Sequence, residues 1–341
     1  MKKPLNLLFL LLLSVTSLFP ENSRAAEAKY VFKIASLAPE GSVWASRFTG
    51  FAKEVSAKTN GEVSFKVYAG GVMGDDRAMY RKMRIGQLQG GGFTMTGISE
   101  VIPDFRILSI PFLFKSYDEV DRVIAGLLPT FQKEFNENGM ELLAMSEVGF
   151  VYTMSTRPID SIAKLRQSKC WAPENDPVSQ AFLKTIGISP IPLTIPDVLS
   201  SLQTGLIDTV FNSLYGTIVM QWFTRTNYLT DVPFGYAYGG LVFSKSAFDK
   251  LPPAYAATCR ELAKKHFAGL LTDTRKSNDD ALVTLKKNGV KMVSFPESDL
   301  AELRKYRDKT VQGISGTAFS KEMYAETMRL LAEARKTPAG K

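Results

Sequence analysis

The segment from 169 to 213 holds the residues best suited to binding a small molecule. Three strand-like pieces, Lys169–Ala172, Ile188–Leu193 and Thr209–Phe211, are each followed by a turn or a helix-start signal. The ends of such strands collect at one edge of a parallel sheet, where ligands bind. Trp171 lies in the first piece, and its indole offers a flat face and one N–H donor. The chemistry predicted here is stacking on a planar ligand or on a cation.

Residues suited to catalysis are sparse. His266 is the only histidine, so sites needing two histidines are excluded and a hydrolase would lack its usual general base. Ser161-Ile-Ala-Lys164 matches S-x-x-K, but neither S-D-N nor K-T-G follows it. The glycine-rich run GGVMGDDR at 70–77 fits neither phosphate-binding pattern. We therefore expect no enzyme, no catalytic residue, no metal and no cofactor.

The two cysteines leave two alternatives open. Cys170 lies in a predicted strand and Cys259 in a predicted long helix. This placement favours two separate buried thiols, while a single disulfide stays possible in an oxidising compartment.

Residues 1–25 are typical of a secretory signal peptide. Lys2 and Lys3 precede an apolar run at 7–13, and Ser23 and Ala25 are the small residues before a cut. A second cut, after residue 28, also fits. Neither this run nor any later segment has the ~20 uninterrupted apolar residues of a membrane span. We expect a periplasmic protein, secreted through a cleaved signal peptide and not itself embedded in the membrane.

Length and charge bound the remaining chain. Without residues 1–25 it has 341 − 25 = 316 residues, which exceeds one usual core and predicts two lobes. The formal charge of +8 falls by 2 with Lys2, Lys3, Arg24 and Glu21, to about +6. Basic residues alternate with acidic ones, as at 264–280, which is typical of solvated helix faces. We expect no nucleic-acid partner.

Two stretches echo each other. Residues 82–93 and 201–212 each combine a helix end, a glycine (Gly86 or Gly205) and a short strand, with seven residues from the glycine to Phe93 or Asn212. Glycine after a helix is a common cap. The echo predicts two lobes of related fold that each deliver a strand end, 93–96 and 211–213, to a shared cleft.

A helical pattern without internal proline runs from 253 to 288. At ~1.5 Å per residue it would reach about 50 Å, enough to span both lobes. We predict an α/β fold in which 26–148 and 235–275 form lobe I, and 149–234 and 276–341 form lobe II.

Five ordered motifs carry a family resemblance. They are KTNGEVSFKVYAGGVMGDDR (Lys58–Arg77), IPFLFKSYDEVDRV (Ile110–Val123), STRPIDSIAKLR (Ser155–Arg166), GISPIPLTIPDVLSSLQTGLIDTVFNSL (Gly187–Leu214) and the long helix after Leu251-Pro252-Pro253. With them the chain resembles the DctP-type solute-binding proteins of TRAP (tripartite ATP-independent periplasmic) transporters over nearly all of its length after the signal. The resemblance implies a two-lobe periplasmic binding protein fold that closes on a small ligand and hands it to a membrane permease, with uptake driven by an ion gradient.

The chain departs from the family's ligand-binding pattern at specific positions. The family's arginine in a K-I-R-V-P-like run is replaced by Trp171, and the arginine of a G-F-R run by Val151. The family's ligand-facing asparagine matches Asn212, although the glutamate often before it is Phe211. The resemblance therefore implies the fold and the transport role, but not the usual dicarboxylate or sialic-acid-type ligand.

The missing arginines change the expected ligand. An arginine binds a carboxylate through two charge-assisted hydrogen bonds, which tryptophan and valine cannot replace. Other donors for a carboxylate are Arg77, Lys115, Arg225 and the helix N-terminus near Asp176. Asp176 and Glu174 can instead meet a ligand amine, although a helix cap and a solvated turn are the favoured interpretation. We expect a bulky or aromatic organic acid.

The predicted substrate-binding residues combine the family positions with nearby aromatic residues. They are Trp171, Asn212, Phe93, Thr94, Tyr152, Val151, Phe211, Trp44 and Tyr215. For each aromatic residue other than Trp171, packing in the core is the competing interpretation. The expected partners are a small-molecule ligand and the TRAP permease subunits, and the chain is expected to be a monomer. The alternative function is a periplasmic ligand sensor that reports to a signalling partner.

Overall fold

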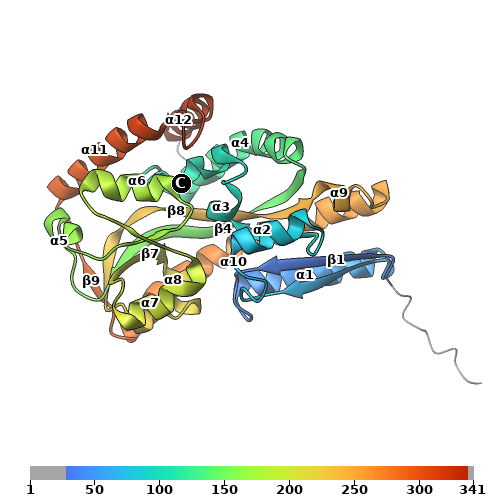
Figure 1. Ribbon diagram of the computed structural model, residues 1–341, viewed down its shortest axis with the longest axis horizontal. Coiled ribbons are helices and arrows are strands. Elements are labelled where there is room, and N and C mark those ends of the chain that lie inside the picture. Colours follow the sequence, from blue (N-terminus) through green and yellow to red (C-terminus); the bar gives the residue numbers. More distant parts are fainter. Residues whose placement is uncertain (1–27, 337–341) are drawn as a thin grey trace, which may run out of the picture.

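The computed structural model describes residues 28–336 and shows a mixed α/β fold (Figure 1). The predicted signal peptide, 1–25, lies outside the described residues. The strands are β1 Tyr30–Ser36, β2 Val63–Tyr68, β3 Gly90–Thr94, β4 Met140–Ser155, β5 Trp171–Pro173, β6 Ile191–Leu193, β7 Thr209–Ser213, β8 Tyr228–Ser244 and β9 Lys291–Val293. Within 28–336, no helix is both long enough and apolar enough to cross a membrane.

Helices cover the sheet and close its ends. The α-helices are α1 Val43–Lys58, α2 Asp76–Arg84, α3 Met95–Ile98, α4 Tyr117–Glu137, α5 Ile162–Arg166, α6 Pro177–Ile186, α7 Val198–Thr204, α8 Leu214–Val219, α9 Lys245–Phe248, α10 Pro253–Lys287, α11 Glu297–Ile314 and α12 Lys321–Lys336. Three 3₁₀ helices join them: η1 Pro103–Ser109, η2 Ile195–Asp197 and η3 Trp222–Thr224.

One seven-stranded sheet runs through the molecule in the order β2-β1-β3-β8-β4-β7, with β9 beside β8. Two long antiparallel strands, β4 and β8, hold it together, paired from Met140↔Ser244 to Ser155↔Tyr228. β3 pairs with one end of β8, and β7 pairs with the far end of β4. The two halves of the protein are therefore joined by continuous strands. β5 and β6 form a separate parallel pair.

The long helix confirms the prediction for 253–288. α10 has 35 residues and runs from the α9 end of the sheet to the β9 end (Figure 1). It packs against α1 in one half and α8 in the other, as well as against β4. The lobe boundaries stay a prediction, and the last helix departs from them: α12 packs against α4 and η1, in the half assigned to lobe I. Its apolar residues, including Met323 and Leu331, complete the core there.

The echoed stretches form matching strand-to-helix junctions. Gly86 and Gly205 follow α2 and α7 with φ of 75° and 71°, a left-handed conformation that glycine adopts without strain. β3 then leads directly into α3, and β7 leads directly into α8. Thr94 and Ser213 are the N-cap residues of these two short helices. Each half thus delivers a strand end followed by a helix start to the centre of the molecule.

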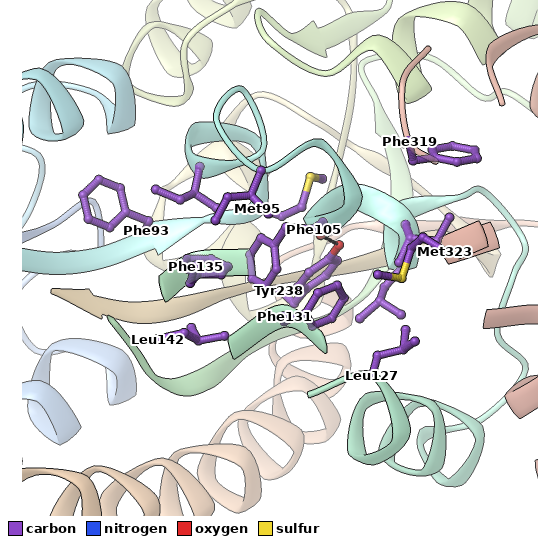
Figure 2. Close-up of a cluster of buried hydrophobic side chains, with 14 of the residues drawn as sticks. Phe93, Met95, Phe105, Leu127, Phe131, Phe135, Leu142, Tyr238, Phe319 and Met323 are labelled. Carbon is purple, nitrogen blue, oxygen red and sulfur yellow. Dashed lines mark hydrogen bonds between the residues drawn. The ribbon is translucent and has the colours of Figure 1, made fainter. Parts of the chain in front are cut away.

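Phe105 lies at the centre of the hydrophobic core in the half of the protein that contains β3 and α4 (Figure 2). Its ring makes edge contacts with Phe131, Phe135 and Tyr238 at centroid distances of 5.2, 5.1 and 5.4 Å. The Tyr238 hydroxyl donates a hydrogen bond to the Phe105 carbonyl. Phe93 belongs to the same cluster, so this core fixes the end of β3.

Both cysteines are free and buried, so the disulfide alternative is not realised. Cys170 forms an isolated parallel β-bridge with Thr209 through its backbone, and Cys259 lies on the buried face of α10.

Candidate ligand-binding cleft

A cavity of about 200 Å³ lies between the two halves of the protein. The end of β3, the start of α1 and the middle of β8 form its wall on one side, and β5, β7 and the start of α6 on the other. Its lining residues are Ser36, Leu37, Ala38, Trp44, Phe48, Gly92, Phe93, Thr94, Met95, Thr96, Ser109, Ser146, Glu147, Val148, Val151, Trp171, Pro173, Asp176, Ser179, Leu183, Ile195, Phe211, Asn212, Gly216, Met220, Trp222, Phe234, Gly235, Tyr236, Ala237, Tyr238 and Gly239.

Most of the predicted substrate-binding residues line this cavity. They are Trp44, Phe93, Thr94, Val151, Trp171, Phe211 and Asn212. Tyr152 and Tyr215 lie outside its wall. Tyr215 packs against Trp44 at a ring distance of 5.0 Å, and its hydroxyl accepts a hydrogen bond from the Val43 N–H at 3.0 Å. Tyr152 packs beside the buried Met154 cluster. Direct contact of any of the nine residues with a ligand stays a prediction.

Trp171 is held firmly in place by its neighbours. The indole Nε1–H donates to the Leu193 carbonyl at 3.0 Å, across the β5–β6 pair. The ring meets Trp222 edge-on at 5.3 Å, and only 4% of the residue is exposed. Because its donor is occupied, Trp171 offers the cavity apolar surface and no hydrogen bond.

Trp44 is fixed in the same manner from the opposite half. Its Nε1–H donates to the Glu147 backbone carbonyl at 2.9 Å. Ser42 caps the helix that carries it by accepting from the Ala45 N–H at 3.2 Å. The start of α1 is thereby anchored to β4 through an aromatic side chain. Trp44 and Trp171 thus both present mainly ring surface to a ligand.

Asn212 contributes an oriented amide. Its Oδ1 accepts from the Ser213 N–H at 2.8 Å. A Cβ at Gly216 would lie 2.5 Å from this oxygen, so only glycine at 216 allows the amide its position. With Oδ1 engaged, we infer that Nδ2 is the donor that Asn212 can direct to a ligand.

Two buried carboxylates also line the cavity. Glu147 is 1% exposed by its side chain and is bound by Arg275 at 3.0 Å and by the Tyr236 hydroxyl at 2.8 Å. Burial nevertheless raises the pKa of Glu147 above its usual range. Asp176 is 3% exposed and caps α6, accepting from the Val178 and Ser179 N–H groups. Burial also raises the pKa of Asp176.

Sequence reasoning missed Glu147, Trp222, Phe234 and Tyr236 as wall residues. Glu147 had a detectable signal, since it is the acidic residue within the mainly apolar stretch 142–154. Phe234 stacks on Phe211 at 4.5 Å. Nothing local marks Phe234 or Tyr236 as wall residues, because β8 places them there only after it pairs with β4.

The predicted alternative carboxylate donors do not reach the cavity wall. Lys115 and Arg225 are exposed and outside it. Arg77 lines a smaller adjoining pocket and is paired with Glu100 at 3.1 Å. The N-terminus of α6 is occupied by the side chain of its own cap, Asp176. Within 28–336, no cluster of histidine, cysteine, aspartate or glutamate residues is arranged to hold a metal ion.

A cleft between two α/β halves that share long strands, with a long helix running along both, defines a class of protein that captures solutes. The sequence profile of the family described as "Bacterial extracellular solute-binding protein, family 7" (DctP) matches residues 34–316. The chain belongs to this family, as its resemblance to TRAP solute-binding proteins implied.

Named relatives and solved structures agree with this assignment. The chain is 23% identical over 278 residues to the sialic acid-binding periplasmic protein SiaP of Vibrio cholerae, covering 80% of this chain and 85% of that protein. The sugar acid binding protein DctPAm of Advenella mimigardefordensis, solved with galactonate, has a TM-score of 0.85 at 22% identity, covering 90% of this chain and 99% of that one. A TRAP periplasmic solute-binding protein of Desulfovibrio salexigens, solved with orotic acid, has a TM-score of 0.82 at 23% identity, covering 90% and 99%. The two solved structures show the shared fold, and the family assignment favours transport over the sensor alternative.

Proposed function

We propose that the protein is the periplasmic subunit of a TRAP transporter that captures a bulky or aromatic organic solute in the cleft and delivers it to a membrane permease. The observation that carries the proposal is the cavity of about 200 Å³ walled by Trp44, Trp171, Trp222 and Phe211 inside a family-7 fold. Wide aromatic surfaces bind planar ligands well, and they do so at low cost in side-chain entropy.

The names of relatives supply the chemical class. One relative binds 2,3-diketo-L-gulonate, another ectoine, and the solved structures hold galactonate, glucuronate or orotic acid. An organic acid is therefore the starting candidate for this chain as well. Trp171 and Val151 stand at the positions where the family resemblance places arginines, so a carboxylate would not be held in the family's usual manner.

The remaining predictions follow from this role. We propose that residues 1–25 direct export and are removed, that the protein acts as a monomer, and that it performs no chemistry on its solute. The permease would recognise the closed, occupied form, because closing joins the two faces that flank the cleft.

The test is to purify the protein without unfolding it and to identify any retained solute by mass spectrometry after denaturation. A panel of small organic molecules is then screened by thermal shift. A solute present at about 100 times its Kd stabilises the folded state by about 2.7 kcal/mol, enough for a clear rise in Tm. Strong stabilisation by succinate or malate, with none by aromatic compounds, would contradict the proposed solute class.

Trp171→Arg sharpens this test. Restoring an arginine at this position should shift preference toward small carboxylates such as succinate. Trp171→Phe is the matched control, because it removes the same bond to Leu193 without adding charge. If both variants retain the preference of the unmodified protein, Trp171 does not determine the choice of solute.

A further inference from the structure

The charged side chains that line the cavity are all acidic. Among the residues described, the cavity wall contains Glu147 and Asp176 but no lysine, arginine or histidine. The chain as a whole carries a formal charge of +8. A basic protein has therefore placed only acidic side chains at its cavity wall, where an anionic solute would need a cation.

A pocket beside the cavity is also mainly acidic. This smaller pocket shares Leu37, Thr96, Pro173 and Ile195 with the cavity and therefore adjoins it. Its other lining residues include Asp75, Asp76, Glu174 and Arg77. Arg77 is the basic residue of this pocket, and Glu100 pairs with it at 3.1 Å. Acidic walls raise the local concentration of cations and lower that of anions.

Asp176 is the wall carboxylate to which no basic side chain is directly bound. Its hydrogen bonds come from two backbone N–H groups and from the Ser179 hydroxyl, none of which carries a full charge. Arg106 acts on it only through space, because the hydrogen bonds of that guanidinium go to two backbone carbonyls, those of Ser99 and Ala318. Glu147 differs, because Arg275 binds it directly. A buried carboxylate without a paired cation is costly, so a cation brought by a ligand would be favourable here.

Many polar groups of the wall are already engaged. The N–H groups of Trp44 and Trp171 donate to backbone carbonyls. The hydroxyls of Thr94 and Ser179 donate to carboxylates, and that of Ser109 donates to a backbone carbonyl. The remaining side-chain donors of the wall, including the Ser36 and Ser146 hydroxyls and Asn212 Nδ2, are uncharged, so a carboxylate here would meet neutral donors and the like charge of Asp176.

We propose that the solute carries a protonated amine, which pairs with Asp176 while its apolar body packs against the aromatic wall. This inference rests on the proposed function and specifies the charge of its solute. A solute that keeps a carboxylate, as the acids bound by relatives do, would then be a zwitterion. The carboxylate would be accommodated beside Asn212, and the amine would provide the recognised charge.

The experiment compares probes that share one aromatic body. Binding of tryptamine, tryptophan, indole-3-propionate and the corresponding uncharged alcohol, tryptophol, is measured by calorimetry and thermal shift on the intact mature protein. Tryptamine or tryptophan should bind at least about tenfold more tightly than indole-3-propionate, the difference expected for one desolvated charge pair. Equal or tighter binding of indole-3-propionate or tryptophol would overturn the proposal.

A variant locates the effect. Asp176→Asn keeps an acceptor that can cap α6 but removes the charge. It should weaken the amine-bearing probe by about tenfold and leave tryptophol unchanged. Asp299→Asn is the matched control, since Asp299 likewise accepts a backbone N–H, that of Ile162, away from the cavity. An equal loss in both variants would overturn the assignment to Asp176. If Asp176→Asn fails to fold, the ranking of the four probes on the unmodified protein decides.

The retained solute separates the two hypotheses. A released compound with a basic nitrogen supports both, whereas an acid without one supports the proposed function and overturns the amine. A final outcome is that no solute is retained and that none of the four probes or the organic acids raises Tm at 1 mM, a concentration that would reveal even weak binding, with a Kd of roughly 1 mM. In that case the proposed solute capture fails and the amine proposal fails with it.

Discussion

The core around Phe105 and the wall of the cleft are both built from aromatic side chains, yet the core is filled and the wall borders a cavity. In the core, Phe105 contacts three rings and its carbonyl accepts a hydrogen bond from the Tyr238 hydroxyl, so these side chains fill the space around one another (Figure 2). In the cleft, Trp171 packs against the ring of Trp222, and Phe211 packs against that of Phe234. Both residues border the cavity of about 200 Å³ between the two halves. Aromatic residues can form a binding surface where the two halves of the protein supply opposite walls of one cavity.

Buried ionisable groups occur in both regions. The cleft and the pocket beside it are lined by three carboxylates that burial makes harder to ionise: Asp76, Glu147 and Asp176. Next to the core around Phe105, Arg106 is 6% exposed and burial raises the pKa of Glu134 on α4 to about 7. The acids of the cleft therefore differ not in being buried but in lining a cavity.

The largest expected effect is on the core. Phe105→Ala should lower the free energy of unfolding by about 3–5 kcal/mol, because it leaves a void among rings that cannot collapse. Urea unfolding followed by circular dichroism measures it. A loss below about 1 kcal/mol would mean that this cluster is not the closed core described here.

The next effect concerns pH. Burial raises the pKa of Asp76 to about 7, and Asp76 accepts hydrogen bonds from the Thr94 N–H and hydroxyl. The folded state then holds a proton that the unfolded state releases near pH 4, so the free energy of unfolding falls as pH rises from about 4 to 7. Asp76→Asn should remove about 1–3 kcal/mol of this fall. Urea unfolding at pH 4.5, 6 and 8 checks it, with the exposed Asp279→Asn as control. A slope that Asp76→Asn leaves unchanged contradicts the prediction.

A smaller effect is expected in the cleft wall. Phe211→Ala should cost about 1–2 kcal/mol, because this ring already borders a cavity and its removal creates less new void. The measurement repeats the urea titration used for Phe105→Ala. A loss equal to that of Phe105→Ala would show that Phe211 is a core residue, and the distinction between the two regions would fail there.

The smallest effect should appear at the thiols. Burial raises the pKa of both, that of Cys259 to about 12. Labelling by a thiol reagent should be at least about a hundredfold slower in buffer than in denaturant. Cys170→Ser and Cys259→Ser report on the remaining thiol separately. Faster labelling of Cys170 than of Cys259 would indicate that the segment around β5 opens more readily than the buried face of α10.

Much of the fold could be predicted because its signals are local. Proline-free helical periodicity predicted α10 almost to the residue, and Gly86 and Gly205 marked the ends of α2 and α7. Part of the wall could be predicted from family positions, as at Trp171 and Asn212, and part from the echoed strand end, as at Phe93 and Thr94. Tyr215 was predicted as a neighbouring aromatic residue, and its hydroxyl binds the Val43 N–H at the start of α1. The placement of α12 on α4 was also missed, because amphipathic helices do not reveal which surface they cover.

The sequence by itself determined the family, the α/β class and the replacement of a family arginine by Trp171, since these depend on residue identity and order. The tertiary structure decided what that replacement means. Pairing of β5 with β6 occupied the indole N–H, and docking of α1 occupied that of Trp44. Folding also brought Glu147 from β4 and Asp176 from α6 to one cavity. Charge in a cleft is a sum over residues distant in the chain, so only the folded arrangement shows which solute charge the site favours.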